Sequence, residues 1–168
     1  MDMSQLNTIF NLDKVLNTNS DLNIDEKGLL NIKYSGTASS NNSNALMTGF
    51  ITRDGDYVLI ELSIYFTVDS ECSRCLKIST KDKNTVIKEK IYLKSENDYD
   101  IDFKEESIDV QPIISEKIID SMSLINLCKI DCNGLCVVCG VEQNSTVCKH
   151  EEKNLKESPF SSLSELDL

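Results

Sequence analysis

The sequence predicts an α+β fold in which an antiparallel β meander packs on one main amphipathic helix and carries a C-terminal cysteine-rich region. Residues 58–68 (VLIELSIYFTV) alternate between two faces with a period of two, as a half-buried strand does. Residues 109–124 (DVQPIISEKIIDSMSL) repeat apolar residues four apart, as an amphipathic helix does. Five of the seven cysteines lie in residues 128–148. We therefore expect a core domain at 1–127 and a cysteine-rich region at 128–168 packed on it.

The first 44 residues predict short elements. Residues 6–12 (LNTIFNL) and 29–38 (LLNIKYSGTA) have the composition of short strands. Residues 18–28 (TNSDLNIDEKG) are rich in Asn, Asp and Ser and are expected to form a loop, and residues 38–45 (ASSNNSNA) a turn.

A β-hairpin is the clearest local prediction. Residues 46–52 (LMTGFIT) form its first strand, and Asp54-Gly55 is suited to a tight turn with positive φ. The second strand is 58–68, with one face directed to the core. That face carries six apolar residues: Val58, Ile60, Leu62, Ile64, Phe66 and Val68.

Two further strands are expected at 76–80 (LKIST) and 85–94 (TVIKEKIYLK), separated by the polar turn KDKN. In the second of these, Ile87, Ile91 and Leu93 share a face with Glu89. The opposite face carries Val86 and a lysine stripe, which we define as Lys88, Lys90, Tyr92 and Lys94. Residues 96–107 (ENDYDIDFKEES) are acidic and predict an exposed loop.

The predicted helix follows that loop. Asp109 is a plausible N-cap, and Pro112 is tolerated in a first turn. The apolar face consists of Ile114, Ile118, Met122 and Ile125, with Ile113 and Ile119 beside it. This helix should pack on the sheet and deliver the chain to Cys128.

The cysteines occur in close pairs that suit a structural metal site. The pairs are Cys72-x2-Cys75, Cys128-x3-Cys132, Cys136-x2-Cys139 and Cys148-x-His150. Structural zinc takes four sulfur or nitrogen ligands as a tetrahedron, commonly from two such pairs. The C-terminal region is therefore a predicted metal-binding region for one or two structural zinc ions, although thiolates also accept iron.

Eight ligands allow two partitions. In the first, Cys136, Cys139, Cys148 and His150 close a local site, while Cys72 and Cys75 meet Cys128 and Cys132. In the second, both C-x2-C pairs share one ion, which joins Cys72 and Cys75 to Cys136 and Cys139. We favour the first because it keeps neighbouring ligands together.

Composition limits the cellular setting and the partners. Residues 1–16 lack a basic segment followed by an apolar run, so we expect no signal peptide, and no window approaches the ~18 apolar residues of a membrane span. A cytosolic location keeps thiols reduced. The formal net charge of −11 excludes nucleic-acid binding through a general electrostatic field. However, residues 74–94 carry seven basic side chains against two acidic ones, and residues 96–109 seven acidic against one basic.

Several stretches resemble the YceD family, the proteins named for large ribosomal RNA subunit accumulation. They are ECSRC (71–75), CNGLCVVCG (132–140) and SPFSSLSEL (158–166), and the resemblance covers about residues 10–165. The family commonly ends its cysteine series with Cys-x-Cys, where this chain has Cys148-Lys-His150. The resemblance implies a cytosolic, non-enzymatic protein needed for normal levels of large-subunit (23S) ribosomal RNA. Family genes often neighbour the gene for a small, basic large-subunit ribosomal protein.

Two partners fit a role in ribosome biogenesis. A ribosomal RNA precursor could contact the lysine stripe and two basic residues near the cysteines, because lysines neutralise phosphates and tyrosine stacks on bases. The same pattern also fits an ordinary polar sheet face. Alternatively, the acidic residues 96–109 could hold a basic large-subunit ribosomal protein, as a chaperone would. The six candidate RNA contacts are Arg74, Lys77, Lys88, Lys90, Tyr92 and Lys94.

Other function classes have weaker support. A thiol-disulfide oxidoreductase needs a low-pKa cysteine at a helix N-terminus, whereas Cys72 and Cys75 follow a strand. A nuclease needs a pair of carboxylates that binds metal, and the spacing of the acidic residues identifies no such pair. We also expect no small-molecule substrate and no membrane partner. A DNA-binding regulator needs a basic helix, and the predicted helix has Lys117 as its only basic residue.

Overall fold

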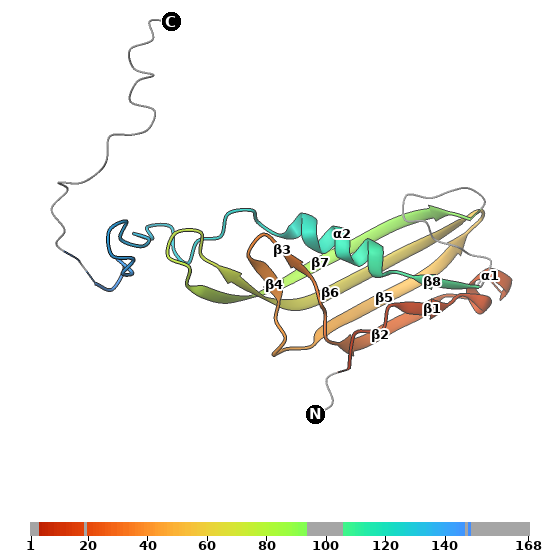
Figure 1. The fold of residues 1–168 in the computed structure, drawn as a ribbon. Coiled ribbons are helices and arrows are strands. Elements are labelled where there is room, and N and C mark those ends of the chain that lie inside the picture. Colours follow the sequence, from red (N-terminus) through yellow and green to blue (C-terminus); the bar gives the residue numbers. More distant parts are fainter. Residues whose placement is uncertain (1–3, 19, 94–105, 147, 149–168) are drawn as a thin grey trace, which may run out of the picture.

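A six-stranded antiparallel sheet forms the body of the protein in the computed structural model, which describes residues 4–18, 20–93, 106–146 and 148 (Figure 1). One edge of β6 (Tyr57–Glu71) pairs along its whole length with β7 (Ile78–Tyr92). The other edge pairs first with β5 (Ala45–Asp54) and then with β4 (Thr37–Ser39). β2 (Leu22–Gly28) lies outside β5, and β3 (Lys33–Tyr34) lies outside β4.

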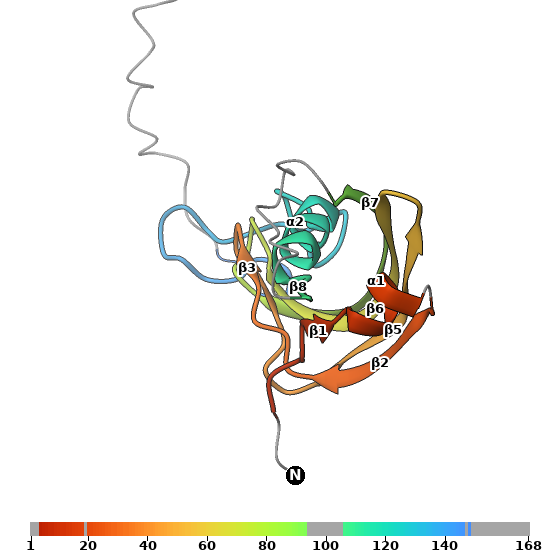
Figure 2. The ribbon, with the colours of Figure 1, turned by 90° about the vertical axis from the view of Figure 1, so that its right-hand side faces the viewer.

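The remaining elements pack on the inner side of the curved sheet (Figure 2). They are the main helix α2 (Gln111–Ser121), the short helix α1 (Asp13–Thr18), and a two-stranded ribbon of β1 (Ile9–Asn11) and β8 (Ser107–Asp109). The predicted α+β class, with an antiparallel sheet and one main helix, is confirmed. No helix among the described residues has the length and apolar character that crossing a bilayer requires.

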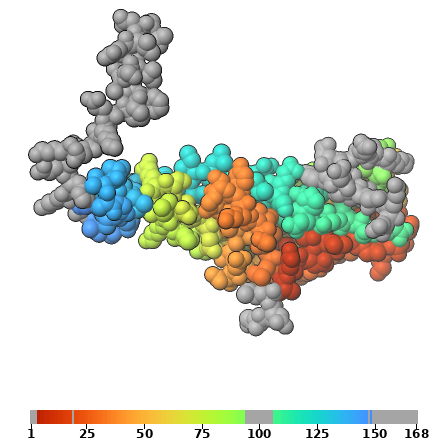
Figure 3. All heavy atoms as spheres, in the orientation of Figure 1, coloured from red at the N-terminus to blue at the C-terminus, as the bar shows by residue number. Residues whose placement is uncertain are grey.

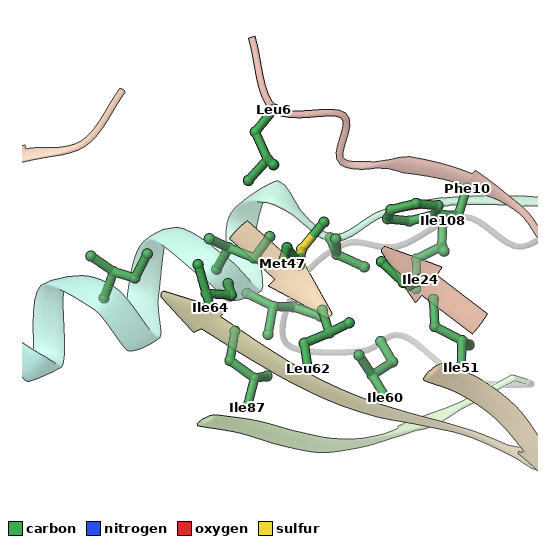
Figure 4. Close-up of a cluster of buried hydrophobic side chains, with 14 of the residues drawn as sticks. Leu6, Phe10, Ile24, Met47, Ile51, Ile60, Leu62, Ile64, Ile87 and Ile108 are labelled. Carbon is green, nitrogen blue, oxygen red and sulfur yellow. The ribbon is translucent and has the colours of Figure 1, made fainter. Parts of the chain in front are cut away.

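The hydrophobic core lies between the sheet and these inner elements (Figure 4). All six residues of the predicted inner face of β6 are at most 1% exposed. They face Ile113, Ile114 and Ile118 of α2, each 0% exposed, and Phe10 and Ile108 of the two-stranded ribbon. The alternation of apolar and other residues in 58–68 therefore correctly predicts which face of β6 lies in the core.

The β5–β6 hairpin also forms as predicted. Asp54 pairs with Tyr57, which leaves Gly55 and Asp56 as a two-residue loop. Gly55 has a φ of 61° at the first loop position, as a type II′ turn requires.

The loop predicted at 18–28 is wrong, because residues 22–28 form the strand β2. Their side chains are polar at most positions, but Ile24 and Gly28 are buried on the inner side. The strand is held by backbone pairing with β5, from Leu22 opposite Ile51 to Gly28 opposite Ala45. Tertiary pairing thus overrides a loop-like composition.

The turn predicted at KDKN is also wrong, because β7 runs through it without interruption. Its polar residues are satisfied across the sheet. The Thr67 hydroxyl donates to Asp82 at 3.0 Å, and the Ser63 hydroxyl donates to Asn84 at 3.1 Å. The length of β6 therefore fixes the length of β7.

The helix is shorter than predicted. It ends at Ser121, so Ile125 lies beyond it and is 69% exposed. The residue at the N-cap position is Val110 rather than Asp109, although the Asp109 carboxylate accepts the Gln111 N–H at 2.9 Å. Of the predicted acidic loop, residues 96–105 lie outside the described residues, and Ser107 begins β8.

Candidate metal centre

Four cysteine sulfurs meet beyond the end of β6. Cys72 and Cys75 come from the turn after β6, and Cys128 and Cys132 from the segment after α2. All four sulfurs lie within 4.8 Å of one another. The Sγ–Sγ distance is 3.8 Å for Cys72–Cys132 and 3.6 Å for Cys75–Cys128. A tetrahedral zinc site with Zn–S bonds of ~2.3 Å has sulfurs about 3.8 Å apart, so the spacing fits that ion.

Asn126 brings these segments together. Its backbone carbonyl accepts the Ser73 N–H at 2.7 Å, and its own N–H donates to the Ser73 hydroxyl at 3.2 Å. Its side-chain amide donates to the Thr37 hydroxyl of β4 at 2.9 Å. The chain after α2 is thus tied both to the turn after β6 and to the sheet.

A second group of sulfurs lies next to the first. Cys136, Cys139 and Cys148 are also within 4.8 Å of one another, with Cys136 buried and Cys139 exposed. His150, the fourth ligand predicted for this group, lies outside the described residues. Together, residues 72–77, 126–146 and 148 form what we call the cysteine knob, at the narrow end of the molecule (Figure 3).

The two C-x2-C turns have the same backbone hydrogen bonds. The Leu76 N–H donates to the Cys72 carbonyl at 2.9 Å, and the Gly140 N–H donates to the Cys136 carbonyl at 2.8 Å. The first cysteine of each turn also donates its N–H five residues ahead, at 2.9 Å to Lys77 and 2.8 Å to Val141. Both turns therefore have the compact geometry that lets two sulfurs reach one ion.

The residue after the second cysteine takes a positive φ in both turns. Gly140 has a φ of 71°, which glycine adopts freely, as its position in the sequence suggested. At the equivalent position Leu76 has a φ of 61°, where a side chain costs about 1–2 kcal/mol. The first turn thus keeps a strained leucine at a position that glycine would fill without strain.

The electrostatics of the sulfurs differ. Backbone N–H groups of Arg74, Cys128 and Cys75 lower the pKa of Cys72 to about 6, and those of Cys139 and Val138 do the same for Cys136. Burial, followed by a hydrogen bond with Cys132, raises the pKa of Cys128 to about 12. The first cysteine of each C-x2-C turn thus has a thiolate form that backbone N–H donors stabilise. Thiolate is the form that binds metal.

The grouping of the seven cysteines corresponds to the first partition predicted from the sequence. Cys72 and Cys75 lie with Cys128 and Cys132, and Cys136 and Cys139 lie with Cys148. The first group offers four sulfurs and leaves no coordination position open, as in a structural site rather than a catalytic one. Zinc at these sulfurs would supply cross-linking of the chain.

Asn144 also belongs to this centre, although no motif in the sequence indicates it. Its side-chain amide donates to the Cys132 sulfur at 3.3 Å, and its oxygen accepts the Asn133 N–H at 3.0 Å. The amide is the main reason that the pKa of Cys132 is lowered. Asn144 belongs to the segment that carries the second sulfur group, so it connects the two groups.

Replacing Asn144 by alanine is expected to weaken metal binding at the first group by roughly 10- to 100-fold, as for other residues that hydrogen-bond a metal ligand. Titration with cobalt(II) in competition with a chelator would measure the affinity. The matched control is Asn42→Ala, an exposed asparagine in a turn outside the knob. Equal cobalt affinities for the two variants would contradict this role.

The candidate RNA contacts do not form one surface. Lys88 and Lys90 lie on the outer face of β7, whereas Arg74 and Lys77 lie in the knob, on the order of 35 Å away at ~3.3 Å per strand residue. Tyr92 packs its ring 5.1 Å from that of Tyr57. Lys94 lies outside the described residues.

The basic side chains at these positions already face partners. Lys88 pairs with Glu61 at 3.0 Å, and Lys90 pairs with Asp54 at 3.3 Å. The Arg74 guanidinium donates to the Cys132 carbonyl at 2.9 Å. To bind RNA phosphates through the lysine stripe, Lys88 and Lys90 would therefore have to give up their carboxylate partners.

A family model described as "Large ribosomal RNA subunit accumulation protein YceD" matches residues 60–167. The matched region begins within β6 and includes all seven cysteines. No curated protein and no solved structure matches the chain.

Proposed function

Because this chain belongs to the YceD family of large ribosomal RNA subunit accumulation proteins, we propose that it is a non-enzymatic factor supporting the synthesis, processing or stability of large-subunit ribosomal RNA. The family name implies a role in the accumulation of that RNA. The match over residues 60–167 is the observation that carries the proposal. A cytoplasmic location fits this role.

We propose that structural zinc holds the cysteine knob in shape. Cys72, Cys75, Cys128 and Cys132 bind one ion, and Cys136, Cys139, Cys148 and His150 bind a second. The sulfur spacing and the closed first group support this assignment. On this proposal the chain divides into a core at 1–127 and a cysteine-rich region at 128–168. The first part contributes the turn at 72–75 to the knob.

Of the two partners that the sequence allows, the observations favour a basic ribosomal protein over ribosomal RNA. The formal net charge of −11 attracts a basic partner and repels phosphate. The lysine stripe is paired with carboxylates at Lys88 and Lys90. Direct RNA contact through the six candidate residues is the alternative proposal within the same function.

Deleting the gene in its native host is expected to lower the ratio of large- to small-subunit ribosomal RNA. Wild-type protein should restore the ratio, whereas Cys72→Ser combined with Cys75→Ser should not, because the knob loses two ligands. Val86→Ser, an exposed change on β7 outside the knob, is the matched control. The measurement is quantitative electrophoresis of total RNA. An unchanged ratio in the deletion strain would refute the proposed function.

A further inference from the structure

The cysteine knob and the residues next to it expose several large apolar side chains. Of the thirteen large apolar residues that are exposed in the described chain, four lie in the knob, and three more, Ile78, Leu124 and Ile125, lie next to it in the sequence. Every turn that carries a pair of cysteines contributes. Leu76 follows Cys75 and is 55% exposed, Ile130 lies between Cys128 and Cys132 at 93%, and Val137 and Val138 lie between Cys136 and Cys139 at 89% and 68%.

Leu76 gives a second, independent indication. Its positive φ is a conformation that glycine adopts without strain, and Gly140 occupies the equivalent position of the other turn. Burial of the leucine side chain does not offset the free energy of that strain, because more than half of the residue is exposed. Because this backbone strain stabilises no contact within the protein, it indicates that Leu76 contacts another molecule.

The charge of the knob and of the whole chain indicates which class of molecule the exposed apolar residues would contact. Among the described residues of the knob, Arg74 is bound to the Cys132 carbonyl, Lys129 lies 3.8 Å from Asp131, and Lys77 acts on Glu142, whose pKa is lowered first by Asn144 and also by this lysine. Arg74 and Lys129 therefore already have partners within the knob. The described knob residues carry three basic side chains against two acidic ones (Asp131 and Glu142), but four thiolates around one divalent ion would add two net negative charges, and the whole chain carries −11. The surface therefore suits a basic protein and is unfavourable for RNA phosphates.

We propose that four exposed apolar residues of the cysteine knob, which we call the knob tips, form a docking surface for a basic protein segment with exposed apolar side chains. The knob tips are Leu76, Ile130, Val137 and Val138. The proposal rests on the proposed function in one respect, which is that the partner is sought among large-subunit ribosomal proteins. The metal orients the tips, and the apolar side chains make the contact.

The decisive variant is Leu76→Gly, because it separates docking from folding. It removes the exposed side chain and relieves the positive φ, so the thermal midpoint of unfolding should stay the same or rise, and the metal content should not change. Tagged wild-type protein, Leu76→Gly and the control Val86→Ser would be mixed at moderate salt with total large-subunit ribosomal proteins freed of RNA. Captured proteins would be identified by mass spectrometry, and the Kd of the purified protein measured by calorimetry.

We expect wild type and Val86→Ser to capture the same basic protein, and Leu76→Gly to raise its Kd roughly tenfold or more, as loss of an apolar hot spot does. A second variant, Val137→Ser with Val138→Ser, should have a similar effect. Equal Kd values for wild type and Leu76→Gly, or no capture by wild type, would overturn the proposal. Binding of protein-free ribosomal RNA in place of the proteins would overturn it, as would self-association that Leu76→Gly abolishes.

The deletion strain keeps the two proposals distinguishable. If deletion lowers the large-subunit RNA ratio but Leu76→Gly restores it fully, the docking surface is refuted while the proposed function stands. If deletion leaves the ratio unchanged, the proposed function fails whether or not capture depends on Leu76.

Discussion

Replacing Cys132 by serine is expected to remove about one zinc equivalent and to loosen the cysteine knob while the sheet stays folded. The Cys132 sulfur is buried, lies 3.8 Å from that of Cys72 and accepts the Asn144 amide. Structural zinc binding contributes about 10–16 kcal/mol in small zinc domains, so losing one ligand removes much of the free energy that orders the knob. The sheet has its own hydrophobic core, separate from the buried cysteine cluster, so it should stay folded without this ion.

Two measurements check this expectation. Native mass spectrometry of protein purified without chelator should show two zinc ions in wild type and one in Cys132→Ser. Hydrogen exchange should rise in residues 126–146 and remain slow in residues 58–68. The matched control is Cys139→Ser, at an exposed sulfur of the second group, which should lose the other ion and leave the first group filled. If wild-type protein without metal exchanged its amide hydrogens in residues 126–146 as slowly as the metal-bound protein does, the knob would need no metal.

Replacing Phe66 by alanine is expected to cost about 3–5 kcal/mol of unfolding free energy. Phe66 is 1% exposed and is among the largest fully buried side chains of the inner face of β6. Its removal leaves a cavity in a core that other side chains fill from two sheets and two helices. Because a domain is stable by only about 5–15 kcal/mol, the variant should be close to unfolding at 37 °C.

Tyr65→Ala is the matched control, since the neighbouring side chain points to the outer face and is 47% exposed. It should cost at most about 1 kcal/mol. Urea unfolding followed by circular dichroism would compare the two variants, because the chain has no tryptophan for fluorescence. Equal midpoints for the two variants would mean that the inner face of β6 does not carry the core.

The parts of the fold that were predictable are those in which local pattern and tertiary role agree. The period of two in β6 is visible because the strand is apolar on one face only, and the hairpin is visible because Gly55 is needed at its turn. The pairing of the cysteines was predictable for a similar reason. The short spacing within each pair is a local property, and the favoured partition required only that neighbours stay together.

The parts that were not predictable depend on contacts between distant residues. β2 and the middle of β7 are strands because β5 and β6 offer partners to them, which no local composition records. Asn144 resembles any loop asparagine until the fold places its amide 3.3 Å from a sulfur. The strain at Leu76 becomes evident only when its turn is compared with that of Gly140.

If the two sulfur groups bind metal as proposed, the long sequence separation within the first group determines when in folding it can bind its ion. Cys75 and Cys128 are 53 residues apart, whereas Cys136 and Cys148 are separated by 12. Closing the longer loop in an unfolded chain costs about 1.3 kcal/mol more, and its ends are aligned only after β6, β7, β8 and α2 have assembled. A newly made chain should therefore load the second group first, and loading of the first group would mark completion of the core.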